Sequence, residues 1–254
     1  MNFDITPLLD HWDYSPGQIV VRKFKGKDGQ EKIQLRVDLG ILQMNATGRP
    51  DGKRPFGHDS LLEHYTAQLE KHRGANSGSD DSFDLKAEDC AKLQQESIQY
   101  HHRYICLFQL KDYEAVIRDT ERNIDVFDLV EQFAADDDLA WSLQQFRPQL
   151  LMMKTRAYGS VAVDEADFAG AIDAIEEGIE ELRRFYTEHT RQDLLEHSGE
   201  IQSLESWLHD IRTKRPMTER EKLESALSEA VQREDYEEAA KVRDALRNLK
   251  PQQT

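Results

Sequence analysis

The stretch TEREKLESALSEAVQREDYEEAAKVRDALRNLK, from Thr218 to Lys250, decides how the rest of the chain is interpreted. It predicts two short helices with a tight break between them. The first helix begins at a capping box formed by Thr218 and Glu221, which directly follows the helix-stopping Pro216. The apolar pattern breaks at Arg233-Glu234 and then resumes. The stretch therefore predicts a helical hairpin.

Each of the two predicted helices carries an apolar stripe. In the first helix the apolar residues recur at i, i+3, i+4, i+7 and i+8, the spacing of one helix face. After the break, Asp235 and Glu238 repeat the capping arrangement, and a second stripe follows. The two stripes consist of Leu223, Ala226, Leu227, Ala230 and Val231, and of Tyr236, Ala239, Ala240, Val242, Leu246 and Leu249. A hairpin of this size buries little apolar area by itself, so we expect it to dock on a like hairpin or on another helix pair.

The sequence of this hairpin resembles the UVR motif of the UvrB and UvrC excision-repair proteins. The same motif also occurs in some Clp-family ATPase subunits and their adaptors. The resemblance covers about 33 of 254 residues. The residues that carry it are Leu223, Leu227, Ala230, Glu234, Asp235, Tyr236, Glu237, Ala239, Ala240, Arg243, Asp244, Leu246 and Leu249. It implies a protein-interaction element that performs no chemistry.

From this resemblance we infer a partner-binding surface on the hairpin, used for a protein partner or for self-association. The residues that we assign to this surface are Leu223, Leu227, Ala230, Tyr236, Ala239, Ala240, Arg243, Leu246 and Leu249. Some UVR adaptors also carry paired-cysteine zinc modules. The two cysteines here, Cys90 and Cys106, are sixteen positions apart and form no CxxC pair, so that role does not transfer and buried free thiols are expected.

The composition is that of a helix-rich soluble protein. Charged residues make up 32% of the chain and aromatic residues 8%. The net charge of −16 argues against a general affinity for nucleic-acid phosphates, although it leaves room for a local basic patch. The first twelve residues lack the pattern of a signal peptide, and no apolar run is long enough to span a membrane. We therefore expect a cytoplasmic protein, and the UVR resemblance suggests a bacterial one.

Residues 1–57 form the first predicted segment, a β-hairpin with a basic loop. The runs Gln18 to Phe24 and Lys32 to Leu39 are alternating and β-branched, with a Gly-containing loop between them. Ile33, Leu35, Val37 and Leu39 fall on one face of the second run. Residues 40–44 either continue that strand or begin a third.

The first segment is basic in an otherwise acidic chain. Residues 17–54 contain nine Lys or Arg against four acids, a net charge of +5, which leaves −21 for the remainder. Arg49, Lys53 and Arg54 are the candidates for binding an anion, whether phosphate, an acidic peptide or nucleic acid. The alternative, which we favour, is an exposed sheet face whose lysines oppose aggregation. The spacing of Gly48 and Gly52-Lys53 does not match a Walker loop.

The remaining segments are predicted to be helical. Residues 58–82 contain a helix capped by Asp59 or Ser60, followed by the flexible linker GANSGSDD. Residues 83–215 form a helical body, and residues 216–250 form the UVR-like hairpin. The helices expected in the body cover residues 83–110, 111–133, 139–158, 167–182 and 191–214. The fold class is therefore mainly α, or α+β when the N-terminal β-hairpin is included.

The helical body shows a weak resemblance to tetratricopeptide repeats (TPRs). Asp112-Tyr113 and Asp167-Phe168 resemble the turn into the second helix of such a repeat, and Asp235-Tyr236 repeats the phrase. The first two phrases lie 55 residues apart, whereas the family repeats every 34 residues or so. Two elongated, TPR-like helical hairpins and a plain helical bundle therefore remain alternatives.

No catalytic or metal-binding pattern is found in the sequence. There is no nucleophile elbow, kinase signature, dinucleotide turn or HExxH pattern. The nine histidines include the neighbours His101 and His102, which on a helix point too far apart to chelate one ion unaided. We therefore expect neither a catalytic residue, a cofactor nor a metal.

These observations favour a non-enzymatic adaptor or scaffold that binds proteins through the C-terminal hairpin and the helical body. The alternative is an accessory factor of nucleotide-excision DNA repair, in which the basic N-terminal segment contacts DNA. The sequence does not name the partner.

Overall fold

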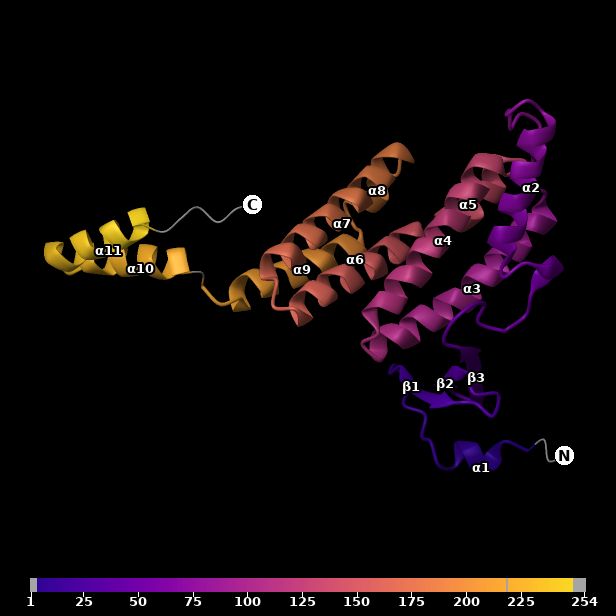
Figure 1. Cartoon of the computed structure of the whole chain (residues 1–254), viewed down its shortest axis with the longest axis horizontal. Coiled ribbons are helices and arrows are strands. Elements are labelled where there is room, and N and C mark those ends of the chain that lie inside the picture. Colours follow the sequence, from indigo (N-terminus) through magenta and orange to yellow (C-terminus); the bar gives the residue numbers. More distant parts are fainter. Residues whose placement is uncertain (1–3, 218, 249–254) are drawn as a thin grey trace. The chain divides into compact units, whose positions relative to one another are not determined.

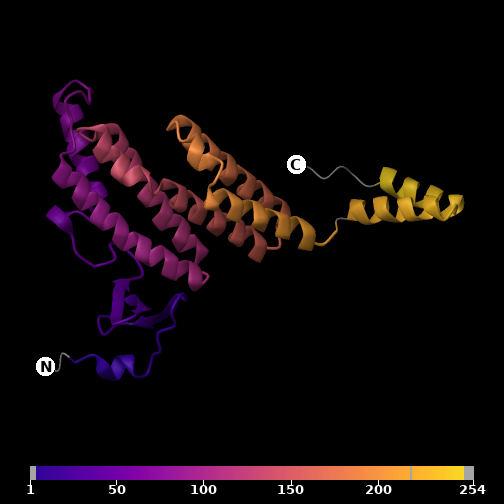
Figure 2. The same cartoon turned by 180° about the vertical axis from the view of Figure 1, so that it is seen from behind.

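The computed structural model describes residues 4–217 and 219–248 and is mainly α-helical (Figures 1 and 2). The chain forms two compact units that divide between Leu208 and His209. The first unit contains a small antiparallel sheet and most of the helices, and the second contains the C-terminal helical hairpin.

The N-terminal segment is a three-stranded antiparallel sheet that follows a short helix, α1 (Thr6–Leu9). The strands β1 (Val20–Lys25), β2 (Glu31–Val37) and β3 (Gly40–Asn45) pair in sequence order. Residues 40–44 therefore begin a third strand. The prediction for Leu39 is wrong: it lies in the tight turn between β2 and β3 and is 88% exposed. The other apolar residues predicted for the same face, Ile33, Leu35 and Val37, lie in β2 and are buried or half-buried.

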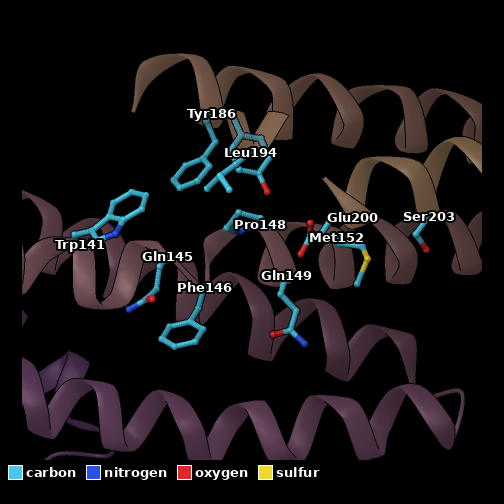
Figure 3. A pocket seen from close by; sticks show the side chains of 12 residues that line it. Trp141, Gln145, Phe146, Pro148, Gln149, Met152, Tyr186, Leu194, Glu200 and Ser203 are labelled. Carbon is cyan, nitrogen blue, oxygen red and sulfur yellow. The ribbon is translucent and has the colours of Figure 1, made fainter. Parts of the chain in front are cut away.

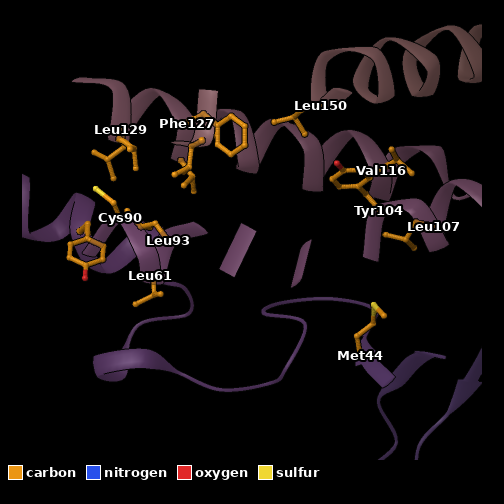
Figure 4. Packing of buried hydrophobic residues seen from close by; sticks show 14 of the residues in the cluster. Met44, Leu61, Cys90, Leu93, Tyr104, Leu107, Val116, Phe127, Leu129 and Leu150 are labelled. Atoms are coloured by element: carbon orange, nitrogen blue, oxygen red, sulfur yellow. The ribbon is translucent and has the colours of Figure 1, made fainter. Parts of the chain in front are cut away.

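One face of the sheet joins the main core. Ile33, Leu35 and Met44 are buried there together with residues of the helices, and Figure 4 shows Met44 of this cluster. On the opposite face Arg36 donates one hydrogen bond to the carbonyl of Trp12, and the guanidinium of Arg22 stacks over the Trp12 ring. The N-terminal lead-in therefore covers the polar face of the sheet.

The helix α2 (Leu61–Ala75) is connected to the sheet through the 3-10 turn η1 (Pro55–Gly57). Ser60 is its N-cap, and the Ser60 hydroxyl accepts a hydrogen bond from the Glu63 amide at 3.1 Å. Leu61, Tyr65 and Leu69 pack into the same core as the strands and the following helices. The segment boundaries that we predicted at residues 57 and 82 therefore lie within one packed core.

The central pair of helices is formed by α3 (Ala87–Gln109) and α4 (Tyr113–Phe133). Their facing sides bury Leu93, Leu107, Val116, Val126 and Val130 almost completely. The cysteines Cys90 and Cys106 are free and buried on α3, as expected from their spacing.

The sequence predicted one helix over residues 139–158, and this prediction is wrong. The chain forms α5 (Asp137–Gln144) and α6 (Arg147–Asp164), which are separated at Gln145 and Phe146. Pro148 occupies the first turn of α6. Because proline lacks an amide donor and clashes with the preceding turn, it fits the start of a helix and not its interior.

A second correction concerns residues 191–214. They form α8 (Gln192–Leu195) and α9 (Gly199–Lys214) instead of one helix. The interruption lies at residues 196–198, where the hydroxyl of Ser198 accepts a hydrogen bond from the Ile201 amide at 3.3 Å. Serine at this position caps the new helix, which is why the continuous apolar pattern did not produce a continuous helix.

Three helical connections share one turn. Lys111, Ala166 and Glu234 each have a positive φ of 58° or 59°. In each case the next residue is an aspartate that caps the following helix, namely Asp112, Asp167 and Asp235. The amide of this aspartate also bonds back to a carbonyl five residues earlier, which closes the preceding helix as in a Schellman motif. The recurring Asp-aromatic phrase therefore marks a local turn, and the TPR-like resemblance is not confirmed.

The helices α6 and α7 (Phe168–Glu188) pack closely because glycine lies at their crossing. A Cβ added to Gly178 would lie 2.0 Å from the Thr155 hydroxyl oxygen and 2.7 Å from its Cβ. Gly159 makes a similar approach to the Trp207 ring of α9.

We predict that Gly178→Ala lowers the free energy of unfolding by about 1–3 kcal/mol, because the added methyl group must push α6 and α7 apart. Gly74→Ala is the matched control: Gly74 is also helical, but no atom lies within 4 Å of an added Cβ. The control is expected to be neutral or more stable by up to about 1 kcal/mol. Urea denaturation of both variants checks the prediction, and equal stabilities would contradict it.

Candidate functional site

The C-terminal hairpin consists of α10 (Glu219–Gln232) and α11 (Tyr236–Asn248). Arg233, Glu234 and Asp235 connect the two helices. An oxygen of the Asp235 carboxylate accepts a hydrogen bond from the Glu238 amide at 3.1 Å, which confirms the predicted second cap. The first cap involves Thr218, which lies outside the described residues.

The interior of the hairpin is small. Among the described residues of the hairpin, Ala230, Ala239 and Val242 are buried, each with 7–8% of its surface exposed. Alanines at facing positions allow two helix backbones to approach closely, which is the arrangement that the sequence predicted. Leu223, Leu227, Ala240 and Leu246, which we also assigned to the partner surface, are half-buried.

Large apolar side chains are exposed beside the turn of the hairpin. Tyr236, the first residue of α11, is 71% exposed, and Val231, near the end of α10, is 52% exposed. The prediction for Tyr236 placed it on the partner surface, but Val231 was omitted from that set. The position of Val231 next to the helix break could have identified it as a residue of the exposed surface. An apolar residue of the stripe that lies near a turn has few neighbours to cover it.

The rest of the hairpin surface is charged and internally paired. The Arg243 guanidinium lies 3.0 Å from the Asp244 carboxylate, and Arg233 lies 2.9 Å from Glu229. The carboxylate of Glu221 accepts hydrogen bonds from Arg215 and raises the pKa of that guanidinium. Exposed ion pairs of this kind contribute little to the free energy of folding, and they leave the charged side chains of the hairpin in contact with water. Leu249, the last predicted partner residue, lies outside the described residues.

Residues 218–252 match the family model of the UvrB/uvrC motif, and the chain therefore carries a UVR motif at its C-terminal hairpin. In UvrB and UvrC this motif mediates interactions. Searches of curated proteins and of solved structures found no match to the chain.

The three candidate anion-binding residues lie in different environments. Arg49 is largely buried, and its Nε lies 2.8 Å from a carboxylate oxygen of Glu96. Arg54 forms an exposed pair with Asp59 at 2.8 Å. Lys53 is exposed. Arg49 and Arg54 therefore already have carboxylate partners.

Sequence reasoning missed a buried charged cluster that holds the loop after β3 on the central helices. Arg103 of α3 is 1% exposed and forms a two-pronged pair with Asp119 of α4, at 2.6 and 2.7 Å. The same guanidinium donates to the carbonyls of Asn45 and Gly48. Only the fold brings these residues together, because the loop and Arg103 are more than fifty residues apart in sequence.

Glu96 is the second centre of this cluster. Its carboxylate is fully buried, accepts hydrogen bonds from the Leu61 amide and is paired with Arg49 and Arg122. The Tyr100 ring lies beneath the guanidinium of Arg122 at 4.1 Å and beneath that of Arg103 at 4.8 Å. Each of these buried charges therefore has an opposite charge beside it, but Arg49 and Arg122 share the one carboxylate of Glu96, and burial lowers the pKa of Arg122 to about 9.

The helical body carries an open groove of about 570 Å³ (Figure 3). It is bordered by α5, α6, α7, α8 and α9 of the first unit. Trp141, Phe146, Pro148, Met152, Tyr186 and Leu194 supply apolar surface. Glu200 is the charged residue of the lining, and its carboxylate accepts a hydrogen bond from the Ser198 hydroxyl at 2.9 Å. An aromatic groove with a carboxylate is suited to an apolar side chain next to a positive charge.

Within residues 4–217 and 219–248, no group of three or more His, Cys, Asp or Glu side chains is arranged to hold a metal ion. The rings of His101 and His102 lie 5.9 Å apart and are tilted by 59°. Among the described helices, none is long and apolar enough to cross a membrane.

We predict that Asp119→Asn lowers the free energy of unfolding by about 3–5 kcal/mol, because it leaves the Arg103 charge buried without a counter-charge. Glu180→Gln is the control, since Glu180 forms an exposed pair with Arg183. Removal of this exposed pair is expected to cost less than about 1 kcal/mol. Denaturation curves of the two variants measure the difference, and a similar small loss in both would show that the buried pair is not required.

Proposed function

We propose that this chain is a non-enzymatic adaptor that binds protein partners through its C-terminal UVR motif. The observation that carries the proposal is the exposure of Tyr236 and Val231 on a hairpin that carries this motif. Large exposed apolar side chains close together on a surface are typical of interaction sites, and tyrosine is enriched among the residues that dominate binding.

The small interior of the hairpin supports the same proposal. Its buried side chains are two alanines and one valine among the described residues, whereas Leu223, Leu227 and Leu246 remain half-buried. A partner that covers these leucines would bury apolar area that the hairpin leaves in water. The chemistry suits a helical partner with its own apolar stripe, including a second copy of the hairpin.

The groove of the helical body is the second partner-binding surface that we propose. Its exposed aromatic residue Phe146 and the carboxylate of Glu200 would accept a segment that carries both apolar and basic side chains. An adaptor needs two such surfaces, one for each protein that it brings together. We place it in the cytoplasm, and its free, buried cysteines support that part of the proposal.

The double variant Val231→Ser/Tyr236→Ser is expected to lose at least about tenfold in affinity for the partner of the hairpin, because it removes the exposed apolar anchors. Affinity pull-down from the source cell, followed by titration of the recovered partner, measures the loss. Recovery of excision-repair subunits or of protease subunits would name the pathway.

Ala226→Ser/Ala245→Ser is the matched control, because both alanines are exposed on the same two helices. It is expected to bind as the unchanged protein does. Circular dichroism verifies that both double variants keep their helix content. If the partners remain bound to the Val231→Ser/Tyr236→Ser protein, the hairpin is not the docking surface.

The alternative function is contact with DNA through the basic N-terminal segment, and the pairing of Arg49 and Arg54 with carboxylates disfavours it. We therefore expect the full chain to show no salt-dependent binding to duplex DNA at low ionic strength. Fluorescence anisotropy with a labelled duplex tests this. Binding whose logarithmic salt slope falls by about 2 in Lys53→Gln/Arg54→Gln would establish the DNA-binding alternative instead.

A further inference from the structure

A second, smaller cavity lies beside the groove, between α3, α4, α5 and α6. Its volume is about 250 Å³. Ile98, Phe127, Leu143, Phe146 and Leu150 form most of its walls. An apolar cavity of about 150 Å³ is large enough for benzene, so this one has room for a single ring with a substituent.

The mouth of the cavity is apolar. Phe146 is 50% exposed and Ile98 is 43% exposed, and both line the opening between the central helices and α6. Phe146 reaches this position because the chain leaves the helix at Gln145 and Phe146, ahead of Pro148. A ligand in the cavity would remove both side chains from water, which favours binding.

Two polar residues of the lining, Ser97 and His101, bear on what the cavity could bind. The hydroxyl of Ser97 is buried and has no hydrogen-bond partner among the described residues. His101 is held through its Nδ1, which lies 2.6 Å from the Tyr104 hydroxyl oxygen. The other ring nitrogen, Nε2, has no hydrogen-bond partner in the described part of the chain. A buried polar group without a partner, such as the Ser97 hydroxyl, is rare in folded proteins and indicates where a ligand or water completes the bonding, whereas His101 is half-buried.

The lining contains no permanently charged side chain. Beyond the apolar walls it consists of Gln94, Ser97, His101, Tyr104, Asn123 and Gln149. Burial lowers the pKa of His101, and the neighbouring His102 lowers it further, so the ring is neutral at pH 7. Because a charged ligand would lose its hydration there without gaining a counter-charge, the cavity suits a neutral one.

We propose that this cavity binds a small neutral molecule made of one aromatic or aliphatic ring with a hydroxyl group. The ring lies against Ile98, Phe127 and Phe146, and the hydroxyl bonds to Nε2 of His101. A hydroxyl suits either tautomer of His101, because it can donate to or accept from Nε2. This site is separate from the C-terminal hairpin, but it shares Phe146 and Gln149 with the groove that we propose as the second partner-binding surface.

Phenol is the probe for the test, with toluene and benzoate as comparison compounds of similar size. NMR titration of the full chain is expected to show saturable binding of phenol at the histidine and isoleucine resonances of the cavity. Toluene is expected to bind about fivefold more weakly, because it lacks the hydrogen bond. Benzoate is expected not to bind, because its charge has no partner in the cavity.

Two variants locate the binding. Ile98→Trp fills the mouth from a half-exposed position and is expected to abolish binding of phenol. His101→Phe is expected to remove the preference of phenol over toluene. His102→Phe is the matched control, since His102 is next in sequence but does not line this cavity, and it is expected to keep that preference.

Thermal unfolding of each variant confirms that it is folded before titration. Phenol binding that persists in Ile98→Trp would overturn the proposal. Equal affinities for phenol, toluene and benzoate, or no saturable binding of phenol, would also overturn it.

Discussion

The packing of the first unit depends on the buried charges of Arg103 and Asp119. These two side chains join α3 to α4, and the same guanidinium bonds to two carbonyls of the loop after β3. The sheet is small and has little apolar area of its own, so it needs such a connection to keep its position on the helices. A salt bridge between Lys23 and Asp112, at 2.6 Å, joins the edge strand β1 to the turn between α3 and α4. Buried polar contacts thus specify a placement that apolar packing alone would leave less well defined.

The parts of the fold that could be predicted from the sequence are those fixed by neighbours in the chain. Alternating apolar residues identified β2, and helical spacing identified α3, α4 and α7. The cap Asp235 was also visible, and the cap of α2 was narrowed to Asp59 or Ser60, because a capping side chain bonds to an amide only three residues away. The UVR motif could be recognised for the same reason, since its pattern lies within one short hairpin.

The features that were missed depend on contacts between distant residues or on a single interrupting residue. The apolar pattern continues through residues 139–158, yet Pro148 starts a new helix and moves Phe146 to the surface. The sequence predicted Arg49 as a candidate for an anion site, but it could not show that the fold places Glu96 beside this guanidinium. The groove and the cavity are also formed by residues from several helices, so no local pattern in the sequence predicts them.

The small interior of the C-terminal hairpin affects what a loss of binding in a variant shows about the substituted residue. Because Ala230, Ala239 and Val242 alone are buried among its described residues, the hairpin gains little stability from its own packing. Folding of the hairpin and the partner binding that we propose for it are then thermodynamically linked, and a measured affinity would include the free energy of ordering the two helices. A substitution at Ala230 would weaken an association without touching the partner. Loss of binding in this motif therefore identifies a contact residue only when the residue is exposed.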